Sequence, residues 1–160
     1  MQELREAQRL DAALGIAYRR IARRDRTSAE IEQHLLERDV DEPTVAAAIT
    51  ELTELGYLDD ARFAIRFTGD RRLLDGWGSS RIERRLRELG VARDLIAAAL
   101  ERGENEQSEL EAAVQQLRRR FSAAPQTARD RRRAVEMLMR RGYALELAHD
   151  ALRRVEAGDD

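Results

Sequence analysis

Arginine clusters are the feature of this 160-residue sequence best suited to chemistry. The chain contains 29 basic residues other than His, and every one of them is Arg. A guanidinium group presents a planar fork of hydrogen-bond donors, which matches the paired oxygens of phosphates and carboxylates. Codon bias in a GC-rich genome would also explain the absence of Lys, so the choice of Arg does not by itself indicate phosphate binding.

The charges are unevenly distributed, although the formal net charge is only -2. Residues 1–26 carry seven Arg against four acids, and residues 27–60 carry one Arg against ten acids. Residues 61–93 carry nine Arg against four acids, and residues 118–141 carry nine against two. Because the acidic block argues against uniform wrapping of DNA, the pattern favours a protein partner with both signs of charge, with nucleic acid nearby.

Helical spacing turns three groups of arginines outward, and these are the candidate binding residues. Solvated surface is the default role of such charges, while their recurrence with few neutralising acids favours binding to phosphate backbone or to an acidic protein groove. Trp77, flanked by two glycines, either packs between helices or anchors a partner. The candidate partner-binding residues are Arg19, Arg20, Arg23, Arg24, Arg26, Arg71, Arg72, Trp77, Arg81, Arg84, Arg85, Arg129, Arg132, Arg133 and Arg140.

No set of residues with catalytic spacing accompanies these arginines. The chain has no Cys, and His34 and His149 each lack a second His three or four residues away, so we interpret both as solvated. Asp59 and Asp60 are adjacent carboxylates at an expected helix start, where capping is the commoner role. We therefore expect no enzyme activity, no metal site and no cofactor.

The elements that must position the arginines are expected to be short helices. Charged residues make up 38% of the chain and aromatics 4%, which is little material for one large core. No apolar run approaches the roughly 18 residues of a membrane span, and the N-terminus does not resemble a signal peptide. The sequence therefore predicts a soluble, cytoplasmic protein.

A repeat of about 50 residues organises these helices. Shifting the chain by 51 residues places Ile31, Leu35 and Ile49 on Ile82, Leu86 and Leu100, and a further shift of 52 places Leu86 on Leu138. The sequence predicts an all-α fold of three tandem three-helix repeats, which are helix-turn-helix-like units in an elongated, bent array. The expected boundaries are 1–58 and 59–103 for the first two repeats, 104–108 for a polar linker, and 109–157 for the third repeat.

Several helix ends can be predicted from local chemistry. Thr27 with Glu30, and Ser80 with Glu83, have the spacing of a capping box, and Pro43 fits the first turn of a helix. The second repeat is expected to end its last helix near Glu101. Because the polar linker has nothing to bury, we expect looser contact between the second and third repeats than between the first and second.

The stretch from Leu55 to Ala64 joins two helices and carries a resemblance. Its residues Gly56, Tyr57, Asp59, Asp60, Arg62 and Phe63 form a pattern, Gly-Tyr-Leu-Asp-Asp-x-Arg-Phe-Ala, that resembles the signature of the RecX family of recombinase modulators. Residues 24–31 and 81–91, with Gly76, also agree with that family. The resemblance covers roughly residues 12–100 well. Asp39-Val40 departs from the family pattern, in which Gly followed by an apolar residue is usual at these two positions.

Membership of this family would imply a specific partner. Family members bind the RecA recombinase, lodge in the groove of its filament on single-stranded DNA, and inhibit its recombinase, ATPase and coprotease activities. The resemblance thus implies a non-enzymatic inhibitor of RecA in DNA repair, recombination and the SOS response, with weak direct DNA binding as a further possibility. The alternatives are a helix-turn-helix-like DNA-binding transcriptional regulator and a helical adaptor for another acidic protein. No heptad seam is evident, which favours a monomer.

Overall fold

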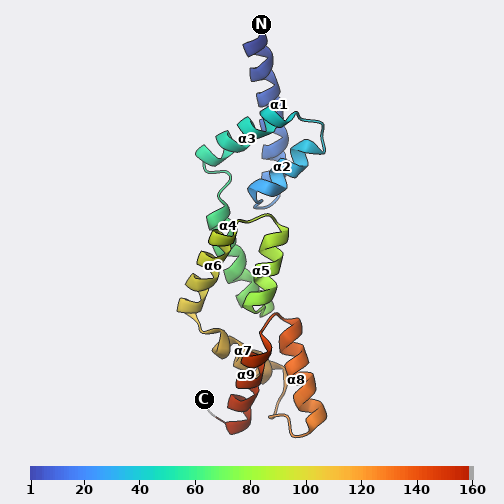
Figure 1. Ribbon diagram of the computed structural model, residues 1–160, viewed down its shortest axis with the longest axis vertical. Helices are drawn as coiled ribbons and strands as arrows, with labels where there is room; N and C mark the ends of the chain where they lie inside the picture. The colour runs from blue at the N-terminus through green and yellow to red at the C-terminus, as the bar shows by residue number, and fades with distance from the viewer. Residues whose placement is uncertain (159–160) are drawn as a thin grey trace.

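The chain folds into three units of three helices each (Figure 1). The computed structural model describes residues 1–158, apart from the side chains of Asn105 and Glu106. Within that range there are nine α-helices, one π-helical turn and no strand. The first unit is α1 (Gln2–Ile21), α2 (Ser28–Leu36) and α3 (Glu42–Glu54); the second is α4 (Asp60–Asp70), η1 (Arg71–Asp75), α5 (Ser79–Glu88) and α6 (Arg93–Glu106); the third is α7 (Glu109–Arg120), α8 (Ala128–Arg140) and α9 (Leu145–Ala157).

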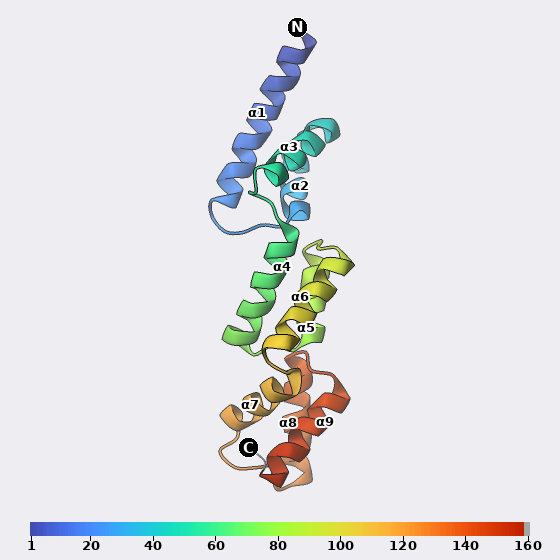
Figure 2. The same cartoon turned by 90° about the vertical axis from the view of Figure 1, so that its left-hand side faces the viewer.

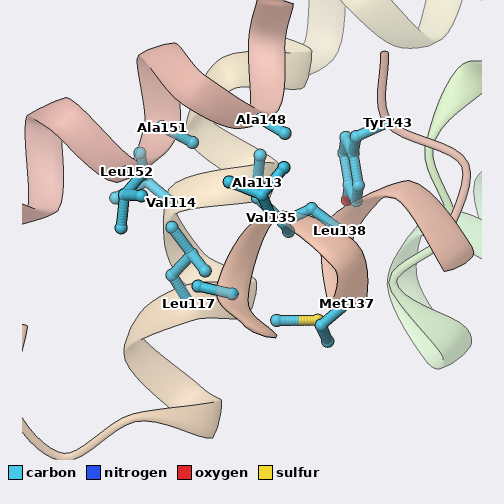
Figure 3. Close-up of a cluster of buried hydrophobic side chains, with 11 residues drawn as sticks. Ala113, Val114, Leu117, Val135, Met137, Leu138, Tyr143, Ala148, Ala151 and Leu152 are labelled. Carbon is cyan, nitrogen blue, oxygen red and sulfur yellow. The ribbon is translucent and has the colours of Figure 1, made fainter. Parts of the chain in front are cut away.

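Each unit has its own small hydrophobic core, as the repeat predicts. In every unit the first helix packs against the third, and the middle helix closes the core. Ile31 and Leu35 of α2, Ile82 and Leu86 of α5, and Leu138 of α8 are fully buried. The third core is shown in Figure 3. The prediction of an all-α array of three tandem repeats is confirmed.

The array is elongated, with the two termini toward opposite ends (Figures 1 and 2). Helix α1 is longer than its counterparts, and residues 2–9 at its start are exposed beyond the first core. Within the described part of the chain, no helix is long and apolar enough to cross a membrane.

Side-chain caps begin several helices where the sequence predicts them. The Thr27 hydroxyl accepts from the N–H of Glu30, and the Glu30 carboxylate accepts from the N–H of Thr27 at 2.9 Å, which completes the predicted capping box. Asp59 accepts from the N–H of Arg62 at 3.0 Å and so caps α4. Pro43 lies in the first turn of α3, where its missing N–H costs nothing.

The start of α5 differs from its prediction. Gly78 is the N-cap residue and contributes no side-chain hydrogen bond, so the expected capping box of Ser80 and Glu83 is wrong. The N–H groups of this helix end are instead bound by atoms of the third unit. Gly78 donates to the Arg141 carbonyl at 2.7 Å, and Ser80 donates to the Gly142 carbonyl at 3.0 Å.

The middle helices therefore stack end to end, as their positions in Figure 1 suggest. We call the contact between the first and second units the first joint, and the contact between the second and third units the second joint. At the second joint the C-terminal end of α8 meets the start of α5. At the first joint the C-terminal end of α5 meets the start of α2. At the first joint the Thr27 hydroxyl donates to the Leu89 carbonyl at 2.6 Å. Opposite ends of the helix dipoles face each other, which is the favourable arrangement.

A carboxylate completes each joint in the same way. Asp60, at the start of α4, accepts from the N–H of Ser28 at 2.9 Å, and Glu109, at the start of α7, accepts from the N–H of Ser79 at 2.6 Å. Each acid begins the first helix of one unit and binds the start of the middle helix of the preceding unit. Asp60 is thus a joint residue, while Asp59 is the cap of its own helix.

The C-terminal ends of the three middle helices share one backbone geometry. At the end of α5 the N–H of Val91 donates to the Leu86 carbonyl, and Gly90 has φ +83°. The same pattern closes α8 at Gly142, with φ +100°. This is the Schellman motif, which places a left-handed residue after the helix. At the end of α2 the left-handed residue is Asp39, with φ +62°, and this is the position where the sequence departs from the family pattern.

Two expectations about the connection between the second and third units are wrong. Helix α6 continues to Glu106, so the backbone of residues 104–106 is helical and the connection is shorter than the expected linker. Among the described residues, the second joint also has more hydrogen bonds between its two units than the first joint has. Beyond the backbone pairs, Arg141 donates to the Asp75 carbonyl at 2.9 Å, and the Tyr143 hydroxyl donates to the Gly76 carbonyl at 3.1 Å.

Candidate functional site

A groove of about 460 Å³ lies at the first joint, between the first and second units. We call it the joint groove. Its apolar floor includes Phe63 and Phe67, whose rings stack with centroids 5.9 Å apart, and Leu89. Four arginines from both units surround this floor: Arg24, Arg66, Arg71 and Arg85.

Each arginine of the joint groove already has a carboxylate partner. Arg24 pairs with Glu30 at 2.8 Å and Arg66 with Asp25 at 3.2 Å. The remaining two pairs are Arg71 with Asp75 at 2.5 Å and Arg85 with Glu88 at 3.1 Å. Exposed ion pairs contribute only about 0–1 kcal/mol each, so a partner that supplies its own charges could displace them. The groove therefore suits a protein surface that offers both signs of charge around an apolar contact.

The arginines predicted to close the first helix do not form one surface. Arg19, Arg20 and Arg23 line a smaller pocket between α1 and α2, whereas Arg24 belongs to the joint groove. Arg26 is 9% exposed and lies 3.7 Å from Glu30. Burial lowers the pKa of Arg26, with the charges of Arg24 and Arg20 acting in the same direction. Its burial beside Glu30, a member of the capping box, favours a structural role.

Several other candidate residues take part in packing within the second unit. Trp77 is partly buried against that core, with Phe67 edge-on at 6.2 Å and the Arg81 guanidinium 4.1 Å above its ring. Arg71 also lies over the Trp77 ring, at 5.8 Å. Arg72 donates to the Ser79 hydroxyl at 2.9 Å. These contacts support the interpretation of Trp77 as a packed residue.

The remaining candidates are exposed on the outer faces of α5 and α8. Arg84 lies on α5, and Arg129, Arg132, Arg133 and Arg140 lie on α8. Because α5 and α8 stack end to end, these five arginines belong to one column of helices. In contrast, their neighbour Arg131 pairs with Glu156 of α9 at 2.6 Å.

Sequence reasoning missed three residues that border these hollows. Arg66 lines the joint groove, and His34 and Arg38 line the pocket between α1 and α2. His34 is partly buried there, contrary to its interpretation as a solvated residue. His34 lies on α2, whereas Arg38 lies in the turn that follows this helix, so helical spacing alone does not place them on one face. The tertiary structure brings both residues to the same pocket.

The motif that carries the family resemblance has a structural role in the connection to α4. Gly56 has φ +80° and ends α3, and Arg62 donates to its carbonyl at 2.9 Å. Tyr57 packs edge-on against Tyr18 with ring centroids 5.0 Å apart. Phe63 lies on the floor of the joint groove. Among the described residues, no group of three or more His, Cys, Asp or Glu is placed to hold a metal ion.

Comparison with known proteins assigns all three units. The family model for the first three-helix domain of RecX matches residues 13–52, that for the second domain matches residues 59–100, and that for the third matches residues 107–152. The chain belongs to the RecX family. The three matches follow one another in the order of the three units.

Relatives and solved structures agree with this assignment. A regulatory protein RecX of Mycobacterium sp. (strain JLS) is 32% identical, with 96% of this chain and 87% of that protein covered. One from Stenotrophomonas maltophilia (strain R551-3) is 34% identical, with 87% and 82% covered. The crystal structure of RecX from Lactobacillus salivarius superposes with a TM-score of 0.81 at 18% identity, over 94% of this chain and 99% of that chain. The last comparison concerns the fold alone.

Proposed function

We propose that this RecX-family chain is a non-enzymatic regulator that binds the RecA filament on single-stranded DNA and inhibits its recombinase, ATPase and coprotease activities. The observation that carries the proposal is the series of three RecX domain matches along one continuous array. The proposed setting is the cytoplasm, in DNA repair and recombination, with the chain acting as a monomer.

The shape and charge of the array support this proposal physically. An elongated body with stacked units can contact successive protomers of a helical filament, whereas a compact domain of this size contacts fewer. The joint groove offers paired charges around an apolar floor, and α5 and α8 offer exposed arginines. Many weak, distributed contacts of this kind fit a repeating partner.

The alternative of a helix-turn-helix regulator is less compatible with the joints. A recognition helix reads base edges with residues near its N-terminus. The N-terminal ends of α2 and α5 are occupied by the neighbouring units, through Leu89 and Gly142. The N-terminal end of α8 is capped within its own unit, where the Thr127 hydroxyl accepts from the N–H of Asp130 at 3.1 Å.

The test measures binding to three immobilised targets: single-stranded DNA, duplex DNA, and RecA filament on single-stranded DNA with a nonhydrolysable nucleotide. We expect filament binding to exceed binding to either bare DNA, and we expect a loss of DNA-dependent ATP hydrolysis by RecA at stoichiometric excess of this chain. Unchanged ATP hydrolysis and strand exchange would refute the proposal. Stronger binding to bare duplex would favour the DNA-binding regulator.

A triple variant tests the contribution of α8. Arg129, Arg132 and Arg133 are exposed, so their replacement by Ala leaves the third core intact. The control replaces Arg5 with Ala, since Arg5 is exposed on the projecting part of α1. We expect the triple variant to weaken filament binding more than the control does at low salt, with the difference decreasing as salt increases.

A further inference from the structure

The pocket between α1 and α2 is a small hollow of about 120 Å³ with an unusual lining. We call it the α1–α2 pocket. Its lining residues are Ile16, Arg19, Arg20, Arg23, His34 and Arg38. Five of the six are basic or contain an imidazole, and none is acidic. The pocket thus brings four arginines together without a carboxylate in its wall.

Among the residues that the structure describes, these four arginines have no carboxylate partner at ion-pair distance. Within the described part of the chain, none of them forms an ion pair or a side-chain hydrogen bond. The joint groove provides the contrast, because all four of its arginines have carboxylate partners. Like charges held close together repel each other, and a bound anion removes that cost.

The pKa of His34 responds to the arginines around it. Burial lowers the pKa of His34 from its ordinary value of 6.5, and Arg20 and Arg38 lower it further. Glu37 acts in the opposite direction, and Arg26 adds a smaller lowering effect. Glu30, Glu37 and Glu88 line an adjoining hollow that shares Arg20 and His34, so these acids lie on the other side of the two residues and not in the wall of the α1–α2 pocket.

We propose that the α1–α2 pocket binds a phosphate group. A carboxylate carries one charge and two oxygens, whereas a phosphate presents more acceptor oxygens and up to two charges. Four guanidinium forks around one small hollow match the larger set of acceptors. The phosphate is either a free or terminal phosphate, which has three or more unesterified oxygens and up to two charges, or a phosphodiester of a single nucleic-acid strand, which has two such oxygens and one charge. The first matches the larger set of donors more fully, and both present phosphoryl oxygens to the guanidinium groups.

The inference is independent of the proposed RecA binding, because its test uses this chain alone. His34 and His149 are the two histidines of the sequence, so their imidazole NMR signals separate easily. His149 is exposed on α9 and serves as the internal control. Each histidine is titrated with pH in chloride, in inorganic phosphate and in acetate, at constant ionic strength because screening alone changes such titrations.

We expect inorganic phosphate to raise the pKa of His34, because a bound anion stabilises the protonated imidazole, and to have no such effect on the signals of His149. Acetate should produce no comparable change. Identical His34 titrations in chloride and phosphate would overturn the proposal. An equal effect of acetate would overturn the preference for phosphate.

Matched variants and two oligonucleotides sharpen the result. Arg38→Gln should weaken phosphate binding about tenfold, in line with the loss of a hydrogen bond between charged groups. Arg5→Gln, the same charge change on the exposed start of α1, should leave binding within about twofold. Equal losses in the two variants would overturn the proposal. Single strands of thymidylate with and without a 5′-phosphate then assign the source: equal shifts of His34 indicate the phosphodiester, and a shift with the phosphorylated strand alone indicates the terminal phosphate.

Discussion

The second joint should be intolerant of even one methyl group at Gly142. An ideal Cβ at this position would lie 2.3 Å from the Cβ of Arg81 and 2.6 Å from its backbone nitrogen. The residue also has φ +100°, a left-handed conformation in which an L side chain costs about 1–2 kcal/mol. Overpacking adds about 1–3 kcal/mol. We therefore expect Gly142→Ala to lower the free energy of unfolding by about 2–5 kcal/mol.

Gly56 supplies the matched control for this substitution. It also has a left-handed backbone, with φ +80°, but an added Cβ would meet no atom within 4 Å. Gly56→Ala therefore introduces the backbone strain without the steric overlap and should cost about 1–2 kcal/mol. The difference between the two variants isolates the contribution of close packing at the joint.

Urea unfolding with two probes measures these effects. Far-ultraviolet circular dichroism reports the helix content of all three units, while fluorescence of Trp77, the single tryptophan, reports the second unit beside the second joint. Two probes are needed because repeat arrays often unfold one unit at a time. Losses that agree within about 0.5 kcal/mol for the two variants would refute the reasoning, since distant sites normally add within that margin.

Three further substitutions test the helix ends and the cores. Asp39→Gly should stabilise the first unit by about 0.5–1 kcal/mol in urea unfolding. The free energy gained by relieving the left-handed backbone strain at Asp39 exceeds the entropic cost of ordering a Gly residue. A loss of stability would contradict the presence of strain at this residue. Leu86→Ala should cost about 2–5 kcal/mol, since Leu86 is fully buried, and an unchanged melting temperature would contradict the core assignment. Burial, with the nearby Glu109 carboxylate, raises the pKa of Tyr143 to about 12. The neutral hydroxyl is therefore favoured in the folded state, and stability should fall by up to about 3 kcal/mol between roughly pH 10 and pH 12. Circular dichroism during alkaline titration should show this fall, and Tyr143→Phe should reduce it; identical curves would exclude Tyr143 as the cause.

The sequence by itself determined the units and most of their ends. Periodic apolar residues such as Ile31, Ile82 and Leu138 identify one buried face per helix, and this depends only on spacing along the chain. The capping box at Thr27 and the left-handed Gly56 are equally local, because their hydrogen bonds join residues within one or two turns. Local chemistry of this kind can be read without knowing the neighbours.

The tertiary structure alone decided how the units join and which arginines remain available. The capping box expected at Ser80 does not form, because Arg141 and Gly142, about 60 residues away in sequence, bind that helix end instead. Arg26 and Arg81 resemble surface residues in the sequence, yet one is buried and the other lies over Trp77. Conversely, Arg38 stands alone in an acidic stretch of sequence and lines the pocket with Arg19 and Arg20 of α1 and Arg23 just after it. The positions of charged residues along the chain can be read from the sequence, whereas the pairing of those charges depends on residues that folding brings together. Sequence spacing therefore located the arginine clusters and could not assign their carboxylate partners.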